Sequence, residues 1–177
     1  MSGWWGVLTL FLIPVGGGIP AGVLLARAHG VDWPAMELLY FVSDVILALV
    51  FEPVMRAMIA GARRHHALAR VAAAMKESVR RTTSAYGTAG GPLALILIAF
   101  GVDPMTGRSA AHAAGHGFLS GWALAITGDM MYFTVIMVST LWLNSVLGDG
   151  TWTMLVILVA MFAVPELIHR WRARGRG

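Results

Sequence analysis

The stretch PVGGGIPAGVLLARAHGVDWP, residues 14 to 34, decides the fold that this sequence predicts. It is apolar enough for a membrane span, yet it contains Pro14, Pro20 and three consecutive glycines. Proline lacks an N–H group and clashes with the preceding helical turn, and each glycine weakens a helix by about 1 kcal/mol relative to alanine. We therefore expect this segment to be broken or re-entrant rather than one regular helix.

A second stretch, GGPLALILIAFGVDP at residues 90 to 104, has the same order of features. A glycine-proline entry is followed by an apolar run and by a Gly-Val-Asp exit that precedes a proline. The two exits, at residues 30–32 and 101–103, lie about 70 residues apart. The pattern indicates a weak internal repeat, and paired segments of this kind point to a membrane protein whose site lies where the repeats meet.

Composition places the chain among integral membrane proteins. Of its 177 residues, 58% are hydrophobic and 12% are charged, and the mean hydropathy is +0.72. A soluble domain carries roughly 25% charged residues. We expect one all-α membrane domain over residues 1–177. The lack of cysteine excludes disulfides and thiolate metal sites.

Apolar runs near the ~20 residues that cross a bilayer divide the chain into two halves, residues 4–55 and 86–169. About six transmembrane or re-entrant helical segments are expected, at residues 4–28, 35–55, 86–102, 109–127, 129–147 and 151–169. The boundary between 127 and 129 is the least well marked, because residues 109–147 form one long apolar tract.

Residues 56–85 differ from both halves, since seven basic residues stand there against the single acid Glu77. Apolar residues recur at helical spacing, which predicts a basic amphipathic helix on the membrane surface. Lipid headgroups are the expected partners of the linker arginines Arg63, Arg64, Arg70, Arg80 and Arg81.

Charge also predicts the orientation. The linker and the basic tail, residues 170–177, should both be cytoplasmic, because polybasic segments resist translocation. Both termini are then inside, most simply at a bacterial-type inner membrane. The net charge of +4 and the pI near 10.3 need no nucleic acid, because anionic headgroups account for them.

Several carboxylates fall in or near the apolar segments, where an acidic side chain is costly. Asp44 lies in mid-span and is either a proton or cation site or a structural residue capped by neighbouring backbone. Asp129 is a solvated turn residue if the chain turns there, and an intramembrane carboxylate if the helix continues. Glu52 and Glu166 are expected to form surface ion pairs with the arginines four residues on.

The expected substrate or ion site combines the two acids with the broken segments. Its members are Asp44, Gly17, Gly18, Pro20, Gly90, Gly91, Pro92 and Asp129. In lipid, each unsatisfied peptide group costs several kcal/mol, so the broken backbone needs a polar partner. Asp44 is the candidate, because it is the carboxylate nearest the middle of an adjacent span.

His112 and His116 are spaced to share one helix face, which can hold a metal. Two ligands make an incomplete site, and the glutamate of a zinc-protease motif is missing. Hydrogen bonding across a close helix contact is the favoured interpretation. A metal or haem held by these histidines is the less favoured alternative, so the cofactor is left open and none is favoured.

The layout resembles the family of small multi-drug export proteins, and more distantly the DedA-like membrane proteins with re-entrant hairpins. The resemblance covers roughly residues 8 to 140. It rests on GGGIP at 16–20, a second span followed by a basic linker, and Tyr86-Gly87 with GGP at 90–92. Ile13-Pro14-Val15 stands where such families often have an acidic residue or a Glu-Arg pair. The resemblance implies a small transporter-like protein.

Three functions follow in order of preference. The first is a small polytopic inner-membrane transporter or flippase-like protein. The second is a non-catalytic accessory subunit of a larger membrane complex, and the third is a histidine-based metal or haem redox protein. No motif of an enzyme appears. The expected partners are membrane lipids and a homo-oligomer or a larger membrane complex, without nucleic acid.

The orientation can be tested with reporter fusions. A reporter fused after Arg64 or after Arg176 is expected to read out on the cytoplasmic side, because the basic segments are not translocated. Alkaline phosphatase and green fluorescent protein are fused at the same positions, because the first is active outside the cytoplasm and the second fluoresces inside it. Activity of the phosphatase fusion at either position would exclude the six-segment topology.

Overall fold

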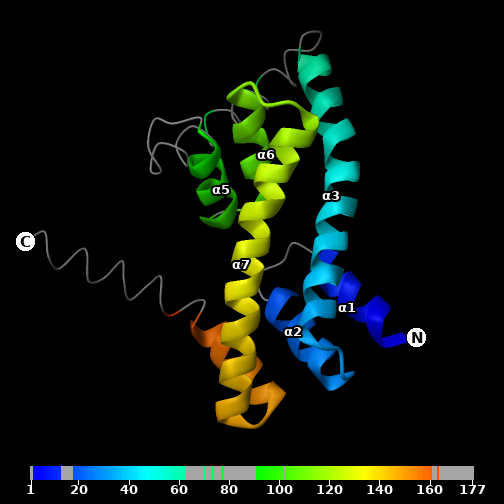
Figure 1. Cartoon of the computed structure of the whole chain (residues 1–177), viewed down its shortest axis with the longest axis vertical. Helices are drawn as coiled ribbons and strands as arrows, with labels where there is room; N and C mark the ends of the chain where they lie inside the picture. The colour runs from blue at the N-terminus through cyan, green and yellow to red at the C-terminus, as the bar shows by residue number, and fades with distance from the viewer. Residues whose placement is uncertain are drawn as a thin grey trace, which may run out of the picture. The chain divides into compact units, whose positions relative to one another are not determined.

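The computed structural model describes residues 2–12, 18–62, 91–101, 103–160 and the isolated positions 70, 73, 77 and 163. All regular secondary structure in these residues is helical, as the sequence predicts (Figure 1). Contacts group the chain into two compact units. Unit 1 comprises Met1–Met36 with Val135–Gly177, and unit 2 comprises Glu37–Thr134.

In unit 1, two short helices pack against each other: α1 (Ser2–Leu12) and α2 (Gly18–Ala28). Eleven residues of α-helix extend only about 16 Å, roughly half the hydrocarbon thickness of a bilayer. Because α1 and α2 pack against each other, they do not form one straight helix, as expected; residues 13–17 between them, with Pro14, lie outside the described residues. Pro20 lies in the first turn of α2, where its missing N–H is not needed for an intrahelical bond.

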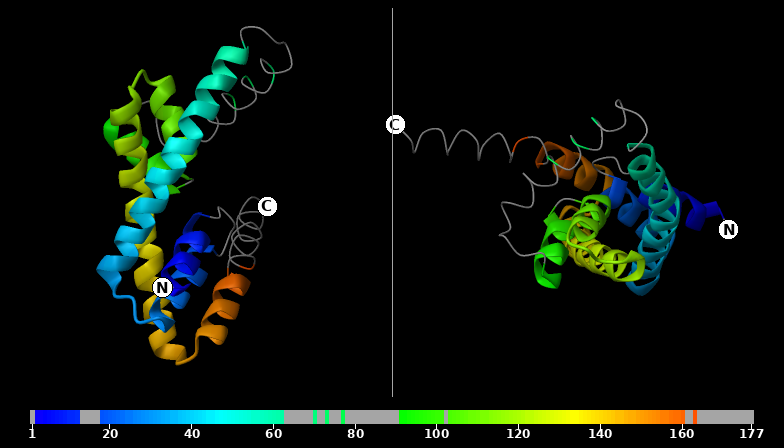
Figure 2. Two further views of the ribbon diagram at one scale, coloured as in Figure 1. Left: turned by 90° about the vertical axis from the view of Figure 1, so that its right-hand side faces the viewer. Right: turned by 90° about the horizontal axis from the view of Figure 1, so that it is seen from above.

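A second pair of short helices lies in unit 2: α5 (Pro92–Gly101) and α6 (Pro104–Ala113). They lie side by side (Figure 2), with Leu95 and Ile98 buried against Ala110 and Ala111. Asp103 begins α6, because its carboxylate accepts hydrogen bonds from the backbone N–H and the hydroxyl of Thr106, both at 2.7 Å. This second pair is also shorter than a membrane span.

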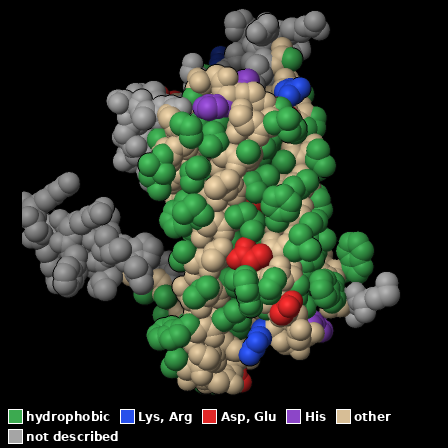
Figure 3. All heavy atoms as spheres, viewed as in Figure 1, with side chains coloured by type: hydrophobic (Ala, Val, Ile, Leu, Met, Phe, Trp, Pro, Cys, Tyr) green, Lys and Arg blue, Asp and Glu red, His purple; other side chains and the backbone are tan. Residues whose placement is uncertain are grey.

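Each short pair is followed by a 30-residue helix: α3 (Trp33–Ala62) and α7 (Phe118–Leu147). Both contain a stretch that is long and apolar enough to cross a membrane, Trp33–Ala57 and Phe118–Leu147. Only 33% and 17% of their most apolar windows are buried, unlike the core helix of a soluble protein. Hydrophobic side chains accordingly cover much of the visible surface in Figure 3.

The chain turns once more after α7. Asp149 caps the helix Gly150–Ala160 by accepting hydrogen bonds from the backbone N–H groups of Thr151 and Trp152. These bonds, with that from Trp152 the largest influence, hold the pKa of the Asp149 carboxyl below its usual range. The predicted segment 151–169 therefore begins as expected, and its second half lies outside the described residues.

Three predicted boundaries are wrong. The turn expected between residues 127 and 129 does not exist, because α7 is continuous there, and the expected helix 109–127 is divided between α6 and α7. The linker does not begin at residue 56, since α3 continues to Ala62. The amphipathic helix predicted for the rest of the linker lies largely outside the described residues.

The register of the predicted repeat is also wrong. The Gly-Val-Asp exit at residues 30–32 precedes the long helix α3, whereas the exit at 101–103 separates the short helices α5 and α6. The two motifs thus occupy different places in the order of helices. Each Gly-Val-Asp motif directly precedes a helix, because an aspartate followed closely by proline favours the first helical turn.

Glycines bring α5 close to its neighbours in unit 2. A Cβ at Gly107 of α6 would lie 2.7 Å from the Cβ of Ala99, and a Cβ at Gly128 of α7 would also lie 2.7 Å from it. The Gly128 Cβ would also come within 2.9 Å of the backbone nitrogen of Phe100. Small residues allow such contacts between helices in membranes. This contact explains why α7 continues through Gly128 instead of turning.

We expect Gly128→Ala to destabilise unit 2 by about 1–3 kcal/mol, because the added methyl group overlaps backbone atoms of α5 that cannot move independently. Thermal unfolding of the purified protein in detergent would measure the loss. Gly150→Ala is the matched control, since the nearest atom to its Cβ is 3.9 Å away. Equal melting temperatures for the two variants would show that the close contact is not needed.

Candidate carboxyl site between α3 and α7

Two buried carboxyl groups meet in unit 2. The side chains of Asp44 on α3 and Asp129 on α7 are 2% and 4% exposed, and their carboxyl groups lie within hydrogen-bonding contact of each other. The Tyr40 hydroxyl donates a 2.9 Å hydrogen bond to Oδ2 of Asp129. Oδ2 of Asp44 is buried without a hydrogen-bond partner among the described residues.

Helical spacing places these groups. Tyr40 and Asp44 are four residues apart on α3, and Asp129 and Phe133 are four residues apart on α7, so each pair shares a helix face. The Tyr40 and Phe133 rings stack with centroids 4.1 Å apart. This aromatic contact fixes the two helices at the height of the carboxyl groups and holds the tyrosine hydroxyl against Asp129.

The arrangement restricts what the two acids can do. Two ionised carboxylates in direct contact repel each other, and burial removes the water that would screen them. The contact is stable only when a proton or a cation lies between the oxygens. A buried oxygen without a partner costs free energy, so the site can gain a proton or cation at Asp44 with little rearrangement.

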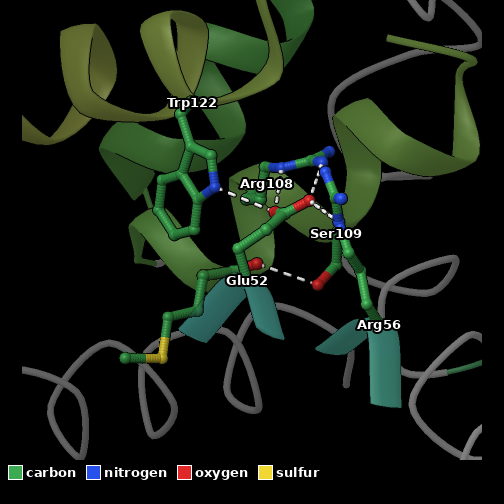
Figure 4. Close-up of polar contacts among 6 residues, drawn as sticks. Glu52, Arg56, Arg108, Ser109 and Trp122 are labelled. Atoms are coloured by element: carbon green, nitrogen blue, oxygen red, sulfur yellow. Dashed lines mark hydrogen bonds and ion pairs between the residues drawn. The ribbon is translucent and has the colours of Figure 1, made fainter. Parts of the chain in front are cut away.

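A second polar cluster in unit 2 surrounds Glu52 (Figure 4). Arg108 of α6 donates from Nε and Nη2 to the two Glu52 oxygens, both at 3.0 Å, and Trp122 of α7 donates its indole N–H at 3.0 Å. Arg56 adds a 2.9 Å hydrogen bond from the exposed side. One carboxylate thus joins α3, α6 and α7, and Arg108 is only 2% exposed.

The sequence predicted part of this cluster. The Glu52–Arg56 ion pair is confirmed, but Glu52 is buried instead of lying at the surface. The equivalent prediction for Glu166 lies outside the described residues. Arg108 was missed, although a signal existed: apart from Arg27, it is the one basic residue outside the linker and the tail. An isolated arginine beside apolar segments is expected to have a buried acidic partner.

The acids of the predicted site come together, whereas the proposed contact with the broken backbone is not among the described interactions. Of the two alternatives for Asp129, the continuous helix is the one observed, since α7 continues through this buried residue. The described contacts of the Asp44 carboxyl are with Asp129 and include no glycine-proline element. Gly18 and Pro20 begin α2, and Gly91 and Pro92 stand at the start of α5; Gly17 and Gly90 lie outside the described residues.

The histidines do not share a helix face, which corrects the prediction. His112 is in the last turn of α6, and the helix ends at Ala113, so His116 lies beyond a turn at Gly115. His112 is exposed and His116 partly exposed. Among the described residues, no three His, Asp or Glu side chains are placed to hold a metal ion together.

Of the five arginines expected to bind lipid headgroups, Arg70 is described, and it is exposed in a helical position. The other four lie outside the described residues: Arg63, Arg64, Arg80 and Arg81. Lipid binding by the linker stays a prediction.

Comparison with known proteins gave no match to a family model, to a curated protein or to a solved structure. The resemblance to small multi-drug export proteins therefore stays a prediction from short motifs.

We expect Arg108→Met to cost about 3–5 kcal/mol, because it leaves Glu52 buried with its main partner removed. Arg56→Met is the matched control at the same carboxylate. The Arg56 side chain is 64% exposed, and an exposed pair contributes about 0–1 kcal/mol. Unfolding in detergent would measure the stability of the Arg108→Met and Arg56→Met variants.

The double variant Glu52→Leu with Arg108→Met should recover most of the loss, since no charge is then left unpaired. A double variant as unstable as Arg108→Met alone would contradict a pairwise ion-pair role.

Proposed function

We propose that this protein is a small inner-membrane transporter or flippase-like protein, and that the Asp44–Asp129 pair is its ion-coupling site. The observation that carries the proposal is a pair of carboxyl groups in contact, both buried, on the two helices that are apolar enough to cross a membrane. Acidic side chains inside membrane segments mark ion pathways and proton relays.

Packing between α3 and α7 does not account for two acidic residues at this contact. Two apolar residues of similar size would hold α3 and α7 together without the cost of burying carboxyl groups. The Glu52 cluster has an arginine partner and joins three helices. The Asp44–Asp129 contact, in contrast, brings two acids together, and the described contacts of Asp44 include no basic side chain. That arrangement suits a group that exchanges an ion.

The short helix pairs give further support. In the proposed topology, the pairs α1–α2 and α5–α6 are re-entrant: each pair enters the membrane and returns to the side from which it came. The long helices α3 and α7 cross the membrane. Helices interrupted within the membrane are tolerated where their freed backbone groups are covered by protein or line a wet cavity, and they recur beside the binding sites of transporters. The proposal keeps the linker and the basic tail cytoplasmic, because α7 and the helix that begins at Gly150 form an even number of crossings between them. It changes the expected position of the N-terminus, because the single crossing of α3 places the residues before α1 on the side opposite the linker.

The test is transport by the purified protein in liposomes under an imposed pH gradient. Two probes represent the expected substrate classes: a fluorescent phospholipid, whose flip is read by dithionite quenching, and the hydrophobic cation ethidium. We expect one of the two probes to move in response to the gradient. Asp44→Asn and Asp129→Asn should each reduce that movement to the level of protein-free vesicles.

Asp32→Asn is the control, because this exposed aspartate precedes α3 and lies outside the pair. Movement unaffected by both buried substitutions would reject the coupling site. If neither probe moves and the protein purifies from native membranes in a stoichiometric complex, the accessory-subunit alternative replaces the transporter.

A further inference from the structure

The order and the bounds of the helices repeat with a fixed offset. Helix α3 spans residues 33–62 and α7 spans residues 118–147, so each position of α3 corresponds to the position 85 residues later in α7. The helices α2 and α6 end with the same offset, at Ala28 and Ala113. Each is preceded by a short helix that packs against it.

Hydrogen bonding at the helix ends follows the same offset. Gly30 and Gly115 have positive φ angles of 71° and 87° after α2 and α6. The N–H group of the next residue bonds to a carbonyl five residues back in both places, from Val31 to Ala26 at 2.9 Å and from His116 to Ala111 at 2.9 Å. This is the Schellman termination, formed twice at matching positions.

With this offset, Asp44 and Asp129 are the same position of the two repeats. The site therefore contains one carboxyl group from each repeat, at corresponding positions. Their surroundings differ, however. Tyr40, which donates to Asp129, corresponds to Ala125, which has no hydroxyl to donate to Asp44. Phe133, which stacks on Tyr40, corresponds to Ala48.

We infer that the two carboxyl groups have different roles: Asp44 takes up and releases the exchangeable proton, while Asp129 stays ionised and Tyr40 acts as the positioning residue that keeps it so. The inference rests on the proposed ion-coupling function of this pair. A hydrogen bond donated to a carboxylate stabilises its charged form, and an oxygen buried without a partner favours the neutral form. The first condition holds for Asp129 and the second for Asp44.

The donors present suit a proton better than a divalent metal. Calcium and magnesium take six or more oxygen ligands, and the pair with Tyr40 offers two carboxyl groups and one hydroxyl. The hydroxyl of Ser43 is already committed to the Tyr40 carbonyl at 2.7 Å. A single proton between two carboxyl oxygens needs no further ligand.

Other titratable groups face the pair from each neighbouring element. Tyr40 lies on α3, Tyr132 lies on α7, and Asp103 precedes α6 and acts on Asp129 through its charge. The Asp103 carboxylate is engaged by the backbone N–H and the hydroxyl of Thr106. Its repulsion of Asp129 is therefore weaker than the direct hydrogen bond from Tyr40.

Infrared difference spectroscopy of the full-length protein in detergent tests the assignment. At neutral pH, exposed carboxyl groups with pKa values near ~4 are ionised, so a protonated-carboxyl C=O band reports buried acids. We expect such a band that titrates on raising the pH. Asp44→Asn should remove it, and Asp129→Asn should retain it.

A further pair of variants isolates the positioning role of Tyr40. In Asp44→Asn the remaining Asp129 keeps its hydrogen bond and stays ionised, whereas Asp44→Asn with Tyr40→Phe should regain a carboxyl band from Asp129. A merely structural role for Tyr40 would not restore the band. Loss of the band in Asp129→Asn with retention in Asp44→Asn, or no band at neutral pH in the unmodified protein, would overturn the inference.

A second measurement needs no substitution. Dicyclohexylcarbodiimide adds to protonated carboxyl groups in apolar surroundings, and mass spectrometry locates the stable adduct. The adduct is expected on Asp44, and an adduct on Asp129 instead would overturn the assignment. Because neither measurement depends on transport, an inactive protein with a protonated Asp44 would reject the transporter while keeping the assignment.

Discussion

The carboxylate of Glu52 is the contact on which the arrangement of unit 2 depends. It accepts hydrogen bonds from Arg108 and Trp122 and so ties α6 and α7 to α3. Among apolar helices a buried charge is tolerated only when it is paired and hydrogen-bonded. The pairing leaves few alternative arrangements of the three helices, because any sliding of one helix would leave a charge without its partner.

Close packing between helices stabilises unit 2 in addition to the ion pair. Ala48, Ala99, Trp122 and Ala125 form a small core between α3, α5 and α7. Alanines and glycines at these contacts let the helix backbones approach each other, which is how helices associate where lipid offers no hydrophobic driving force. Ala48 and Ala125 of this core lie one helical turn from Asp44 and Asp129, which are both buried.

The two polar clusters of α3 have opposite electrostatic character. Glu52 is surrounded by donors, including two arginines, so its charge is neutralised by the protein itself. Asp44 meets another acid, and its described contacts include no basic side chain. The first cluster therefore joins three helices through a paired charge, and the second brings two acids together on two of the same helices. The two acids stand at matching positions of α3 and α7, whose bounds differ by 85 residues.

From the residues alone, the helical character of the chain and its most unusual residues could be predicted. Composition predicted an all-helical chain with membrane-spanning segments, because so few charged residues cannot cover a soluble surface. Proline and glycine predicted the break between α1 and α2, since their effect on a helix is local. Asp44 could be identified as a candidate site residue because an acidic side chain in the middle of an apolar span costs free energy whichever way it is oriented.

Only the tertiary structure decided the partners. The Tyr40–Asp129 hydrogen bond joins residues 89 positions apart, and the Glu52–Arg108 pair joins residues 56 apart. No local pattern encodes such contacts. Thr127-Gly128-Asp129 has the composition of a turn, yet the helix continues through it because Gly128 packs against α5. Local preferences of about 1 kcal/mol per residue are outweighed there by packing between helices, which is the physical reason why the site could not be derived from sequence alone.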